Sequence, residues 1–503
     1  MILHIEGNIS RYYVETLCMV YFPGATFREN EKREDGVPEV TVRVFEIGSL
    51  VRATVAIRIG ERIAEAEGGC EHSTDKSEMR AAKLAVGRAF LAAGKEFFSY
   101  TPPWGMLTGV RPAKVATELI LKGNGLRNSR AILRDEYFLN PRKAALAVSV
   151  AATEMKLTSR LPSNLCSVYI SIPFCPSRCA YCSFVSYSSD KQLPLIDDYL
   201  QALYRDIDST FSVIRELGLT VATVYIGGGT PTVLSPLQMA RLLDKIGEHV
   251  SPDTLMEYTV EAGRPDTITR EKLAVIHEAG VGRISVNPQT LSDDVLRSIG
   301  RRHTVDDFYR AFSLARESGI PMLNVDMIAG LPGDTFQIFS ESFDKVVALS
   351  PENITVHTFA VKRAADLRRQ DGIYTLGSQE AAKSVDYSQI QAKMTGYRPY
   401  YMYRQKNTVG NLENVGFALP GTEGLYNIFM MEELHSIFAA GAGAVTKLVK
   451  YRKPTEGNSV IKRIFMPKYP YEYLRDAERL RSGDPSLGIP SHREKILSFY
   501  QGE

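Results

Sequence analysis

Residues 167–184, SVYISIPFCPSRCAYCSF, combine a predicted β-strand with a cysteine-rich loop. The loop places Cys175, Cys179 and Cys182 in a C-x3-C-x2-C spacing directly after the strand. A cubane iron–sulfur cluster normally takes four cysteine thiolates. Three thiolates leave one iron with an open position, much as a catalytic zinc ion keeps one ligand position open. The spacing therefore predicts a [4Fe-4S] cluster that can bind a further ligand.

A structural zinc site is the alternative, with Cys166 completing a set of four thiolates. Six cysteines in 503 residues are too few for a disulfide scaffold. The cysteine loop opens a long pattern of alternating strands and helices, whereas a zinc knuckle is small and self-contained. This position favours the iron–sulfur cluster.

After the cysteine loop, strand-like and long helical segments alternate along the chain. Six strands are expected, at 167–174, 221–228, 257–262, 282–288, 323–330 and 354–360. The segments between them can hold crossover helices, which indicates a parallel sheet with right-handed connections. In barrels of this kind the chemistry lies at the carboxyl ends of the strands. The motifs described below fall at or after such ends.

The predicted fold class is α/β: a partial (β/α)6 TIM-like barrel with an N-terminal α+β domain and a C-terminal, mostly helical region. We expect the N-terminal domain at 1–160, the barrel at 161–360 and a substrate-covering region at 361–503. Within the first domain, a period of two over 40–45 and 52–59 predicts antiparallel strands. A helical period from Ala81 to Ala92 follows.

The composition is that of a globular protein, with 44% hydrophobic residues and a net charge of +2. This small net charge gives no reason to expect nucleic acid as a partner. No apolar run is long enough to cross a bilayer. The N-terminus carries acidic and polar residues where a signal peptide needs an apolar stretch. We therefore expect a cytoplasmic protein.

Glycines and a carboxylate end the second and third predicted strands. In Gly227-Gly228-Gly229-Thr230, bare backbone can approach the ammonium and carboxylate groups of a ligand. A tight turn between strand and helix is the alternative. Glu261 ends the next strand, and an unpaired acid is costly to bury. A cationic or hydroxyl-bearing ligand is its simplest partner.

Asp326 lies on an otherwise apolar strand, where a buried carboxylate needs a partner. The ribose hydroxyls of a nucleoside are one candidate. A salt bridge with Arg301 is the other. The sequence leaves both interpretations open.

Six motifs together resemble those of one family. They are YISIPFCPSRCAYCSF (169–184), GGGTPT (227–232), VEAGRPD (260–266), RISVNPQT (283–290), IGRRHT (299–304) and VDMIAGLPGDT (325–335). In this order the motifs resemble those of the oxygen-independent coproporphyrinogen III oxidases, which are radical SAM enzymes. The resemblance covers about residues 166–450 and is closest to the HemZ-type branch, which also shares segments 351–364 and 400–421.

The resemblance implies two cofactors, a [4Fe-4S] cluster on the three cysteines and S-adenosyl-L-methionine (SAM), of which two molecules can be held. The residues that match the family's SAM contacts are Tyr169, Tyr181, Gly228, Gly229, Thr230, Glu261, Gln289, Arg301, Asp326 and Ala360. One position departs from the family pattern. Ser171 stands where the family commonly has a histidine, and serine does not titrate near neutral pH.

The activity that the resemblance implies is oxidative decarboxylation of coproporphyrinogen III. A 5′-deoxyadenosyl radical removes a hydrogen atom from the β-carbon of a propionate, and loss of CO2 and one electron leaves a vinyl group. Two such reactions give protoporphyrinogen IX in anaerobic haem biosynthesis. The expected partners are the tetrapyrrole and an electron donor such as flavodoxin or ferredoxin. Lys362, Arg363, Arg404 and Lys406 are candidate propionate clamps, or parts of a solvated basic face.

Two rival functions fit the same resemblance. Some relatives in this family are haem-trafficking proteins that keep the cluster and SAM but do not decarboxylate. Others use the radical for haem degradation or methyl transfer. Turnover of coproporphyrinogen III distinguishes the oxidase from both.

Overall fold

The structure is a computed structural model of the whole chain. It describes every residue other than 33, 73–76, 183–192, 361–372, 406–407, 454–458, 484–489 and 503, and of 373–378 it describes the backbone alone. The chain divides into two compact units, Met1–Ala152 with Tyr403–Leu412 and Thr153–Met402 with Glu413–Glu503. The division into functional segments at residues 160 and 360 stays a prediction.

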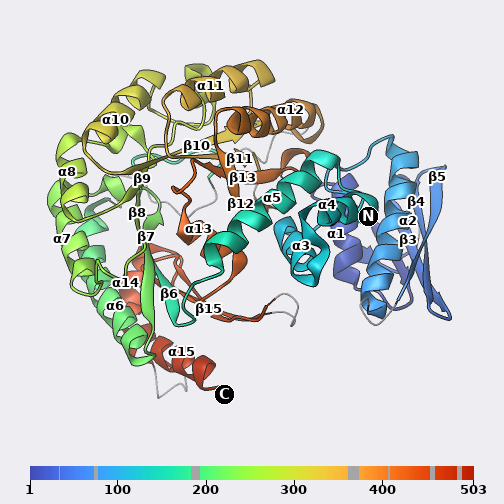
Figure 1. The fold of residues 1–503 in the computed structure, drawn as a ribbon, viewed down its shortest axis with the longest axis horizontal. Helices are drawn as coiled ribbons and strands as arrows, with labels where there is room; N and C mark the ends of the chain where they lie inside the picture. The colour runs from blue at the N-terminus through green and yellow to red at the C-terminus, as the bar shows by residue number, and fades with distance from the viewer. Residues whose placement is uncertain are drawn as a thin grey trace. The chain divides into compact units, whose positions relative to one another are not determined.

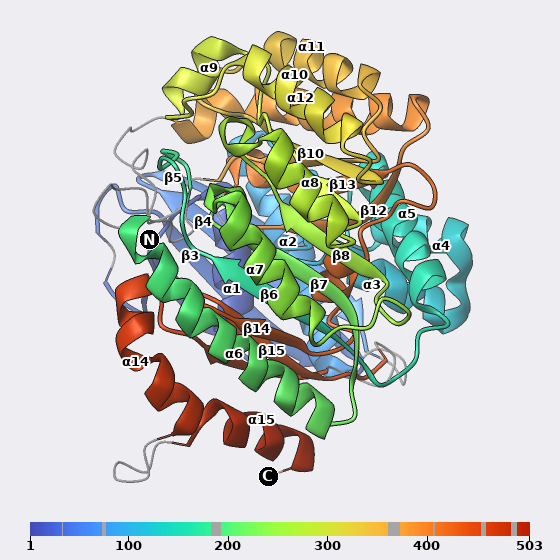
Figure 2. The same ribbon diagram turned by 90° about the vertical axis from the view of Figure 1, so that its left-hand side faces the viewer.

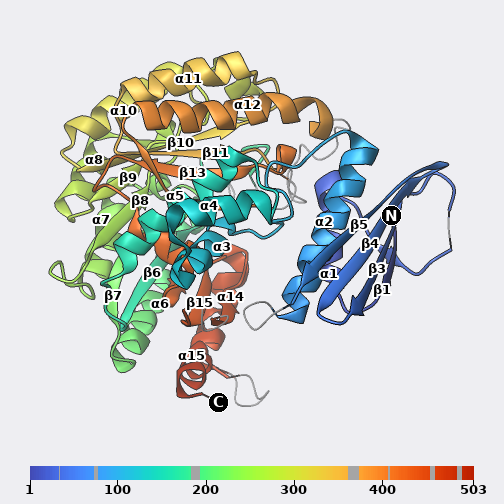
Figure 3. The same cartoon turned by 45° about the vertical axis from the view of Figure 1, so that its right-hand side comes forward.

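The first unit is built on a five-stranded sheet in the order β2-β1-β3-β4-β5, with α2 along one face (Figure 3). Its elements are β1 (Ile2–Glu6), α1 (Arg11–Tyr21), β2 (Arg28–Glu29), β3 (Glu39–Ile47), β4 (Leu50–Ile59), β5 (Arg62–Glu71), α2 (Glu78–Phe98), α3 (Pro112–Leu119), a π-helical turn (Ile120–Asn124) and α4 (Gly125–Asp135). The antiparallel pairing of β3 with β4 confirms the strands expected from the period of two.

Local sequence explains how these elements begin and turn. Gly48 and Gly60 have positive φ and open the two-residue loops that join β3 to β4 and β4 to β5. The hydroxyl of Ser77 caps α2 by accepting from the main-chain N–H of Arg80. The predicted apolar face of α2 is buried from Ala81 onward, except that Ala92 is exposed.

The second unit contains the predicted barrel. Its six parallel strands are β6 (Leu165–Ile172), β7 (Thr220–Gly228), β8 (Glu257–Glu261), β9 (Arg283–Ser285), β10 (Met322–Ala329) and β11 (Asn353–Thr358). Neighbours in the sheet are neighbours in sequence. Helices α6 (Ile196–Glu216), α7 (Pro236–Gly247), α8 (Arg270–Glu278), α9 (Asp293–Ser298), α10 (Val305–Glu317) and α11 (Phe336–Ala348) connect them. Figure 2 shows these helices along the outer side of the sheet.

The sheet continues past both ends of the six-stranded core and does not close. On one side lie β13 (Glu413–Ala418), antiparallel to β11, and β12 (Arg398–Arg404). On the other side β14 (Ile437–Ala440) runs parallel to β6, followed by β15 (Val445–Lys450) and β16 (Val460–Phe465). The remaining helices are α5 (Pro141–Thr158), α12 (Ile373–Met394), α13 (Leu425–Glu432), α14 (Pro470–Ser482) and α15 (His492–Gln501). The six core strands lie within a few residues of their predicted positions.

Alternate residues of a strand lie on the same face of a sheet. On the inner face of the six core strands, these alternate residues are polar or aromatic. Members of this face are Ser167, Tyr169, Ser171, Thr223, Tyr225, Glu257, Thr259, Glu261, Arg283, Ser285, Asn324, Asp326, Thr355 and His357. Helix α13 lies against it, inside the curve of the strands (Figure 1). The carboxylate of Glu257 accepts from the main-chain N–H groups of Leu425 and Tyr426 and so caps this helix.

The outer face of the strands carries the hydrophobic core, with Val168, Ile170, Val224, Ile226 and Val260 fully buried. None of the described helices is both long enough and apolar enough to cross a membrane.

Candidate active site

The cysteine loop leaves the carboxyl end of β6 and is held by main-chain hydrogen bonds on both sides. The N–H of Thr230, just after β7, donates to the carbonyl of Phe174 at 2.7 Å. The N–H of Ala180 donates to the carbonyl of Ile299 at 3.0 Å. The loop is therefore fixed between residues that follow the second strand and residues that follow α9.

Hydrogen-bond donors reach the sulfur atoms of Cys175 and Cys179. Thr230 Oγ1 donates to Cys175 Sγ at 3.3 Å, and Arg264 Nη1 donates to Cys179 Sγ at 3.7 Å. Cys175 and Cys179 are buried, Cys182 is half-buried, and none of the six cysteines forms a disulfide. Hydrogen bonds to sulfur are what the thiolate ligands of iron–sulfur clusters receive. The donor set therefore fits a cluster on this loop.

The structure does not support the zinc alternative. Cys166 lies near the start of β6, six residues before the strand ends at Ile172, so about 20 Å of strand separates it from the loop. A single zinc ion holds its sulfur ligands about 3.8 Å apart, from its bond length of about 2.3 Å and tetrahedral geometry. Among the described residues one group of three potential ligands gathers within 4.8 Å, and it contains no cysteine.

The glycines after β7 are required by the packing of the cysteine loop. A Cβ on Gly229 would lie 2.5 Å from the carbonyl oxygen of Phe174 and 3.0 Å from Cys175 Sγ. Gly228 has φ of +106°, and its Cβ would lie 2.9 Å from Ser171 Oγ. These positions therefore do more than turn the chain, because any side chain there would displace the cysteine loop or β6. Their contact with SAM stays a prediction.

Glu261 ends β8 on the polar inner face and already has one partner. Tyr225 Oη donates to Glu261 Oε1 at 2.6 Å. Burial raises the pKa of Glu261 to about 7, with Tyr225 opposing the shift and Asp326 adding to it. A carboxylate with such a pKa is stabilised in its charged form by any cation that approaches it. Glu261 is thus suited to accept from the ammonium group of a ligand.

Three tyrosines stack beside Glu261. Ring centroids of Tyr225 and Tyr426 lie 4.5 Å apart, and those of Tyr169 and Tyr225 lie 6.0 Å apart, with small interplanar angles. Tyr426 reaches this stack because Glu257 holds the start of α13. The stack brings residues from two strands and from α13 into one aromatic wall.

Arg301 is buried and its guanidinium is held by three oxygen atoms. Nη1 donates to the carbonyls of Gly263 and Asn287 at 3.1 and 3.0 Å, and Nη2 donates to Tyr181 Oη at 3.1 Å. Burial alone would lower the pKa of Arg301, but Tyr181 and Cys179 beside it raise the pKa above its ordinary value. Arg301 therefore stays charged and joins the cysteine loop to the ends of β8 and β9.

Asp326 has a different set of partners, so the salt bridge with Arg301 does not form between these two described residues. Asp326 Oδ2 accepts from Asn287 Nδ2 at 2.9 Å, and Asn287 Oδ1 accepts from the Asp326 N–H at 3.0 Å. His357 Nε2 lies 3.7 Å from Oδ2. Asn287 thus links the two residues, through its carbonyl to Arg301 and through its side chain to Asp326.

Gln289 and Ala360 complete the predicted set. Gln289 has φ of +71°, its N–H donates to the carbonyl of Asp326, and its carbonyl accepts from the N–H of Ile328. This left-handed conformation is uncommon for a residue other than glycine. Ala360 is half-buried and lies two residues after the end of β11. Both residues lie near the carboxyl ends of barrel strands, as predicted.

Ser171, in the place of the family histidine, is a buried structural residue. Its Oγ donates to the carbonyl of Ala442 at 2.8 Å, and its own carbonyl accepts from Tyr199 Oη at 2.7 Å. A Cβ added at Gly228 would lie 2.9 Å from this Oγ. A larger side chain here would have to displace one of these neighbours.

The guanidinium of Arg404, a candidate propionate clamp, is already bonded to main-chain carbonyls. It belongs to the first unit, where its guanidinium donates to the carbonyls of Leu107 and Asn411 and lies 5.7 Å from the ring of Trp104. Arg404 is 7% exposed. The other three proposed clamps, Lys362, Arg363 and Lys406, lie outside the described residues.

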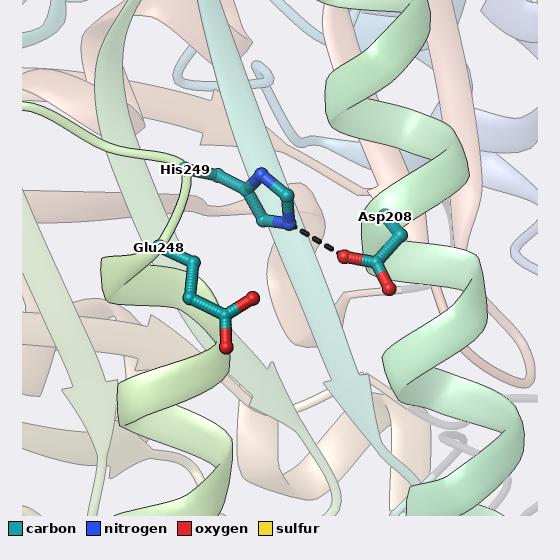
Figure 4. A group of neighbouring side chains, drawn as sticks. All are labelled: Asp208, Glu248 and His249. Atoms are coloured by element: carbon teal, nitrogen blue, oxygen red, sulfur yellow. Dashed lines mark hydrogen bonds and ion pairs between the residues drawn. The ribbon is translucent and has the colours of Figure 1, made fainter.

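One further cluster of potential metal ligands consists of Asp208, Glu248 and His249 (Figure 4). His249 Nε2 lies 2.7 Å from Asp208 Oδ1. Lys245 Nζ lies 2.9 Å from Asp208 Oδ1 and 2.7 Å from Glu248 Oε2. The ammonium group of Lys245 therefore already supplies the positive charge that these carboxylates attract.

The structure adds four residues that the sequence analysis did not single out: Tyr225, Arg264, Asn287 and Tyr426. Two of them lie within quoted motifs, Arg264 in 260–266 and Asn287 in 283–290. Tyr225 lies two residues before Gly227 on the same strand, so the period of two could have placed it on the inner face. Tyr426 had no comparable signal, because α13 joins the site from outside the barrel repeat.

Comparison with known proteins extends the resemblance. The Radical SAM superfamily model matches residues 169–346. The chain is 37% identical over 381 residues to the oxygen-independent coproporphyrinogen-III oxidase-like protein HemZ of Bacillus subtilis, covering 75% of this chain and 76% of that protein. It is 34% identical over 280 residues to the heme chaperone HemW of the same organism, covering 55% of this chain and 70% of that protein.

Among solved structures, the coproporphyrinogen III oxidase HemN of Escherichia coli shares the fold. The TM-score is 0.50, with 22% sequence identity, and the match covers 65% of this chain and 72% of that chain. This likeness supports the architecture described above.

Proposed function

This chain belongs to the HemZ-type branch of the oxygen-independent coproporphyrinogen III oxidase family of radical SAM proteins, and we propose that it converts propionates of coproporphyrinogen III to vinyl groups. Each reaction removes a hydrogen atom from the β-carbon of a propionate, releases the carboxylate as CO2 and passes one electron to an acceptor. Two reactions give protoporphyrinogen IX. A low-potential carrier in the cytoplasm, such as flavodoxin or ferredoxin, is the proposed electron donor.

The observation that carries this proposal is the extent of the likeness to HemZ. The Radical SAM model covers residues 169–346, which correspond to the barrel shared by enzymes with many substrates. The match to HemZ covers 381 residues and therefore includes long segments outside that barrel. Segments outside the barrel are where substrate-specific contacts are added to a common catalytic core.

The family uses a [4Fe-4S] cluster and SAM, which when bound supply the radical that removes the hydrogen atom. Cys175, Cys179 and Cys182 are the proposed cluster ligands. Their loop is anchored on both sides, and donors already reach the sulfur atoms of Cys175 and Cys179. The residues of the cysteine loop and their hydrogen-bond donors therefore fit a [4Fe-4S] cluster.

The residues beyond the cysteine loop bind and orient SAM in this proposal. Glu261 accepts from the ammonium group of the methionine moiety, and Tyr225 fixes the orientation of its carboxylate. Asp326 binds ribose hydroxyls while Asn287 holds it in place. The other proposed contacts are Tyr169, Tyr181, Gly228, Gly229, Thr230, Gln289, Arg301 and Ala360.

The aromatic wall of Tyr169, Tyr225 and Tyr426 has a separate role. It closes the inner face of the sheet against water next to Glu261 and so protects a reactive radical from solvent. The capping of α13 by Glu257 keeps Tyr426 in this wall.

An anaerobic assay on protein with a reconstituted cluster tests the proposal. We expect CO2 and singly and doubly vinylated products from coproporphyrinogen III, with 5′-deoxyadenosine formed in step. The Cys179→Ser variant is the matched control and should give neither product. SAM cleavage without vinyl products would exclude the decarboxylase while leaving the cofactor assignment intact.

Haem binding without decarboxylation is the second candidate, favoured by the 34% identity to the heme chaperone HemW. In that case the reconstituted protein would bind haem tightly and leave coproporphyrinogen III unchanged. Absorbance titration with haem and the turnover assay, run on the same preparation, distinguish the two functions.

A further inference from the structure

A buried arginine outside the cysteine motif contacts the middle thiol of the loop. Arg264 follows β8 by three residues, is 85 positions from Cys179 in sequence, and is 3% exposed. Its Nη1 donates to Cys179 Sγ at 3.7 Å and to the carbonyl of Ser177 at 3.3 Å. A charged donor therefore lies at the sulfur atom of a proposed cluster ligand.

The orientation of this guanidinium is set from its opposite edge. Nε and Nη2 donate to the two carboxylate oxygens of Asp266 at 2.9 and 3.0 Å. Burial alone would raise the pKa of Asp266, but the Arg264 guanidinium holds it below its usual range. A planar, two-pronged pair of this kind is specific to arginine, because a lysine ammonium cannot bind both partners with fixed geometry.

Other charges around Cys179 do not take over this role. Arg301 lies near enough to Cys179 to interact electrostatically, but its hydrogen bonds go to Tyr181 and main-chain carbonyls. Burial lowers the pKa of His303 to about 4, so that imidazole is neutral. Arg264 is thus a cation that donates directly to a thiol of the loop.

Hydrogen bonds and positive charge at the cysteine ligands stabilise the reduced, more negative state of an iron–sulfur cluster. We propose that Arg264 sets the reduction potential of the [4Fe-4S] cluster by donating to Cys179, and that Asp266 moderates this effect. The step concerned is the entry of one electron from an external reductant into the oxidised cluster, and no bond in the protein forms or breaks. The proposal rests on the cluster and not on the identity of the tetrapyrrole.

A substitution of Asp266 tests the proposal in the opposite direction. Its side chain is 26% exposed, so it can be changed with less disturbance of packing than Arg264. Replacing it with asparagine removes a negative charge while leaving Arg264 and Cys179 in the protein. The positive charge then acts on the thiolate with less compensation.

The test is an EPR-monitored redox titration of reconstituted protein, with dithionite as reductant and no SAM or tetrapyrrole present. We expect Arg264→Gln to weaken the affinity of the cluster for its electron about tenfold, a shift of about 59 mV to more negative potential. Asp266→Asn should move the potential in the opposite direction. Arg270→Gln is the control, because Arg270 is exposed and pairs with Glu317, and it should leave the potential unchanged.

Iron and sulfide content are measured on every variant. An unchanged potential in Arg264→Gln at normal iron content overturns the proposal, as does a shift of both variants in the same direction. Should Arg264→Gln fail to hold iron, Asp266→Asn decides alone: a more positive potential supports the proposal, and an unchanged or lower one overturns it. Because no substrate is used, these results do not depend on whether the protein decarboxylates coproporphyrinogen III.

Discussion

Tyr225 Oη donates a hydrogen bond of 2.6 Å to Oε1 of Glu261, from the neighbouring strand of the barrel. This contact brings a phenol and a carboxyl group together at the polar inner face, beside Gly227, whose added Cβ would lie 3.1 Å from Glu261 Oε2. The hydrogen bond also holds the carboxyl group of Glu261 in one orientation before any ligand binds.

The raised pKa of Glu261 predicts a pH dependence of stability. The unfolded pKa is near 4.5 and the folded pKa about 7, so folding favours the protonated acid. The stabilisation is complete below pH 4.5 and is lost as pH rises through 7. Relative to the Glu261→Gln variant, the free energy of unfolding of the unmodified protein should therefore fall by on the order of 3 kcal/mol as pH rises across this window. Chemical denaturation of both proteins at pH 5, 6, 7 and 8 measures this difference. The same pH dependence of stability in both proteins would contradict the raised pKa of Glu261.

Removing the Tyr225 hydroxyl tests the contact itself. Because the hydrogen bond from Tyr225 lowers the pKa of Glu261, Tyr225→Phe should raise that pKa further. NMR of the labelled glutamate carboxyl carbon as a function of pH reports the change. Tyr258→Phe is a suitable control, since its hydroxyl has no hydrogen-bond partner among the described residues. An unchanged or lower pKa in Tyr225→Phe would rule out this role for the hydroxyl.

The cysteine assignments predict a clear contrast between two variants. Cys179→Ser should lose the iron, sulfide and visible absorbance of the reconstituted cluster. Cys166→Ala should keep all three, because Cys166 is buried near the start of β6, far from the loop. Metal analysis of both proteins checks this. Loss of metal from Cys166→Ala at normal folding would restore the zinc alternative.

Gly229→Ala should destabilise the protein by about 1–3 kcal/mol, because the added methyl group meets Phe174 and Cys175. It should also lower the iron content after reconstitution. Gly247→Ala is the matched control, since the new Cβ meets no atom within 4 Å at the end of α7. That change should be neutral or stabilising by up to about 1 kcal/mol. Equal effects of the two substitutions on iron content would refute the packing argument.

Asn287→Ala should weaken SAM binding about tenfold, because the carboxylate of Asp326 loses its donor and the Asp326 N–H loses its acceptor. Anaerobic calorimetric titration of the reconstituted protein with SAM measures the affinity. Asn164→Ala, which removes an exposed hydrogen bond to Thr220, should leave the affinity unchanged. Wild-type affinity in Asn287→Ala would remove this residue from the proposed site.

Much of the fold followed from periodicity along the chain. The six strands of the barrel lie within a few residues of their predicted positions, because each is a short segment rich in β-branched residues and is separated from the next by a helix-length segment. The sequence also showed the cysteine loop, since its three cysteines lie within eight residues. Five further strands, β12 to β16, extend the sheet without a repeating signal.

What the sequence by itself determined, then, is the order of strands and helices and the location of local motifs at strand ends. Tertiary structure alone decided which side chains meet: Arg264 with Cys179, Asn287 with Asp326, and Tyr426 with Tyr225. It also decided that Arg404 lies within the first unit, where its guanidinium bonds main-chain carbonyls. The reason is physical, because spacing along a chain fixes which residues share a face, whereas the partner across a sheet depends on strand register and on crossovers that span tens to hundreds of residues.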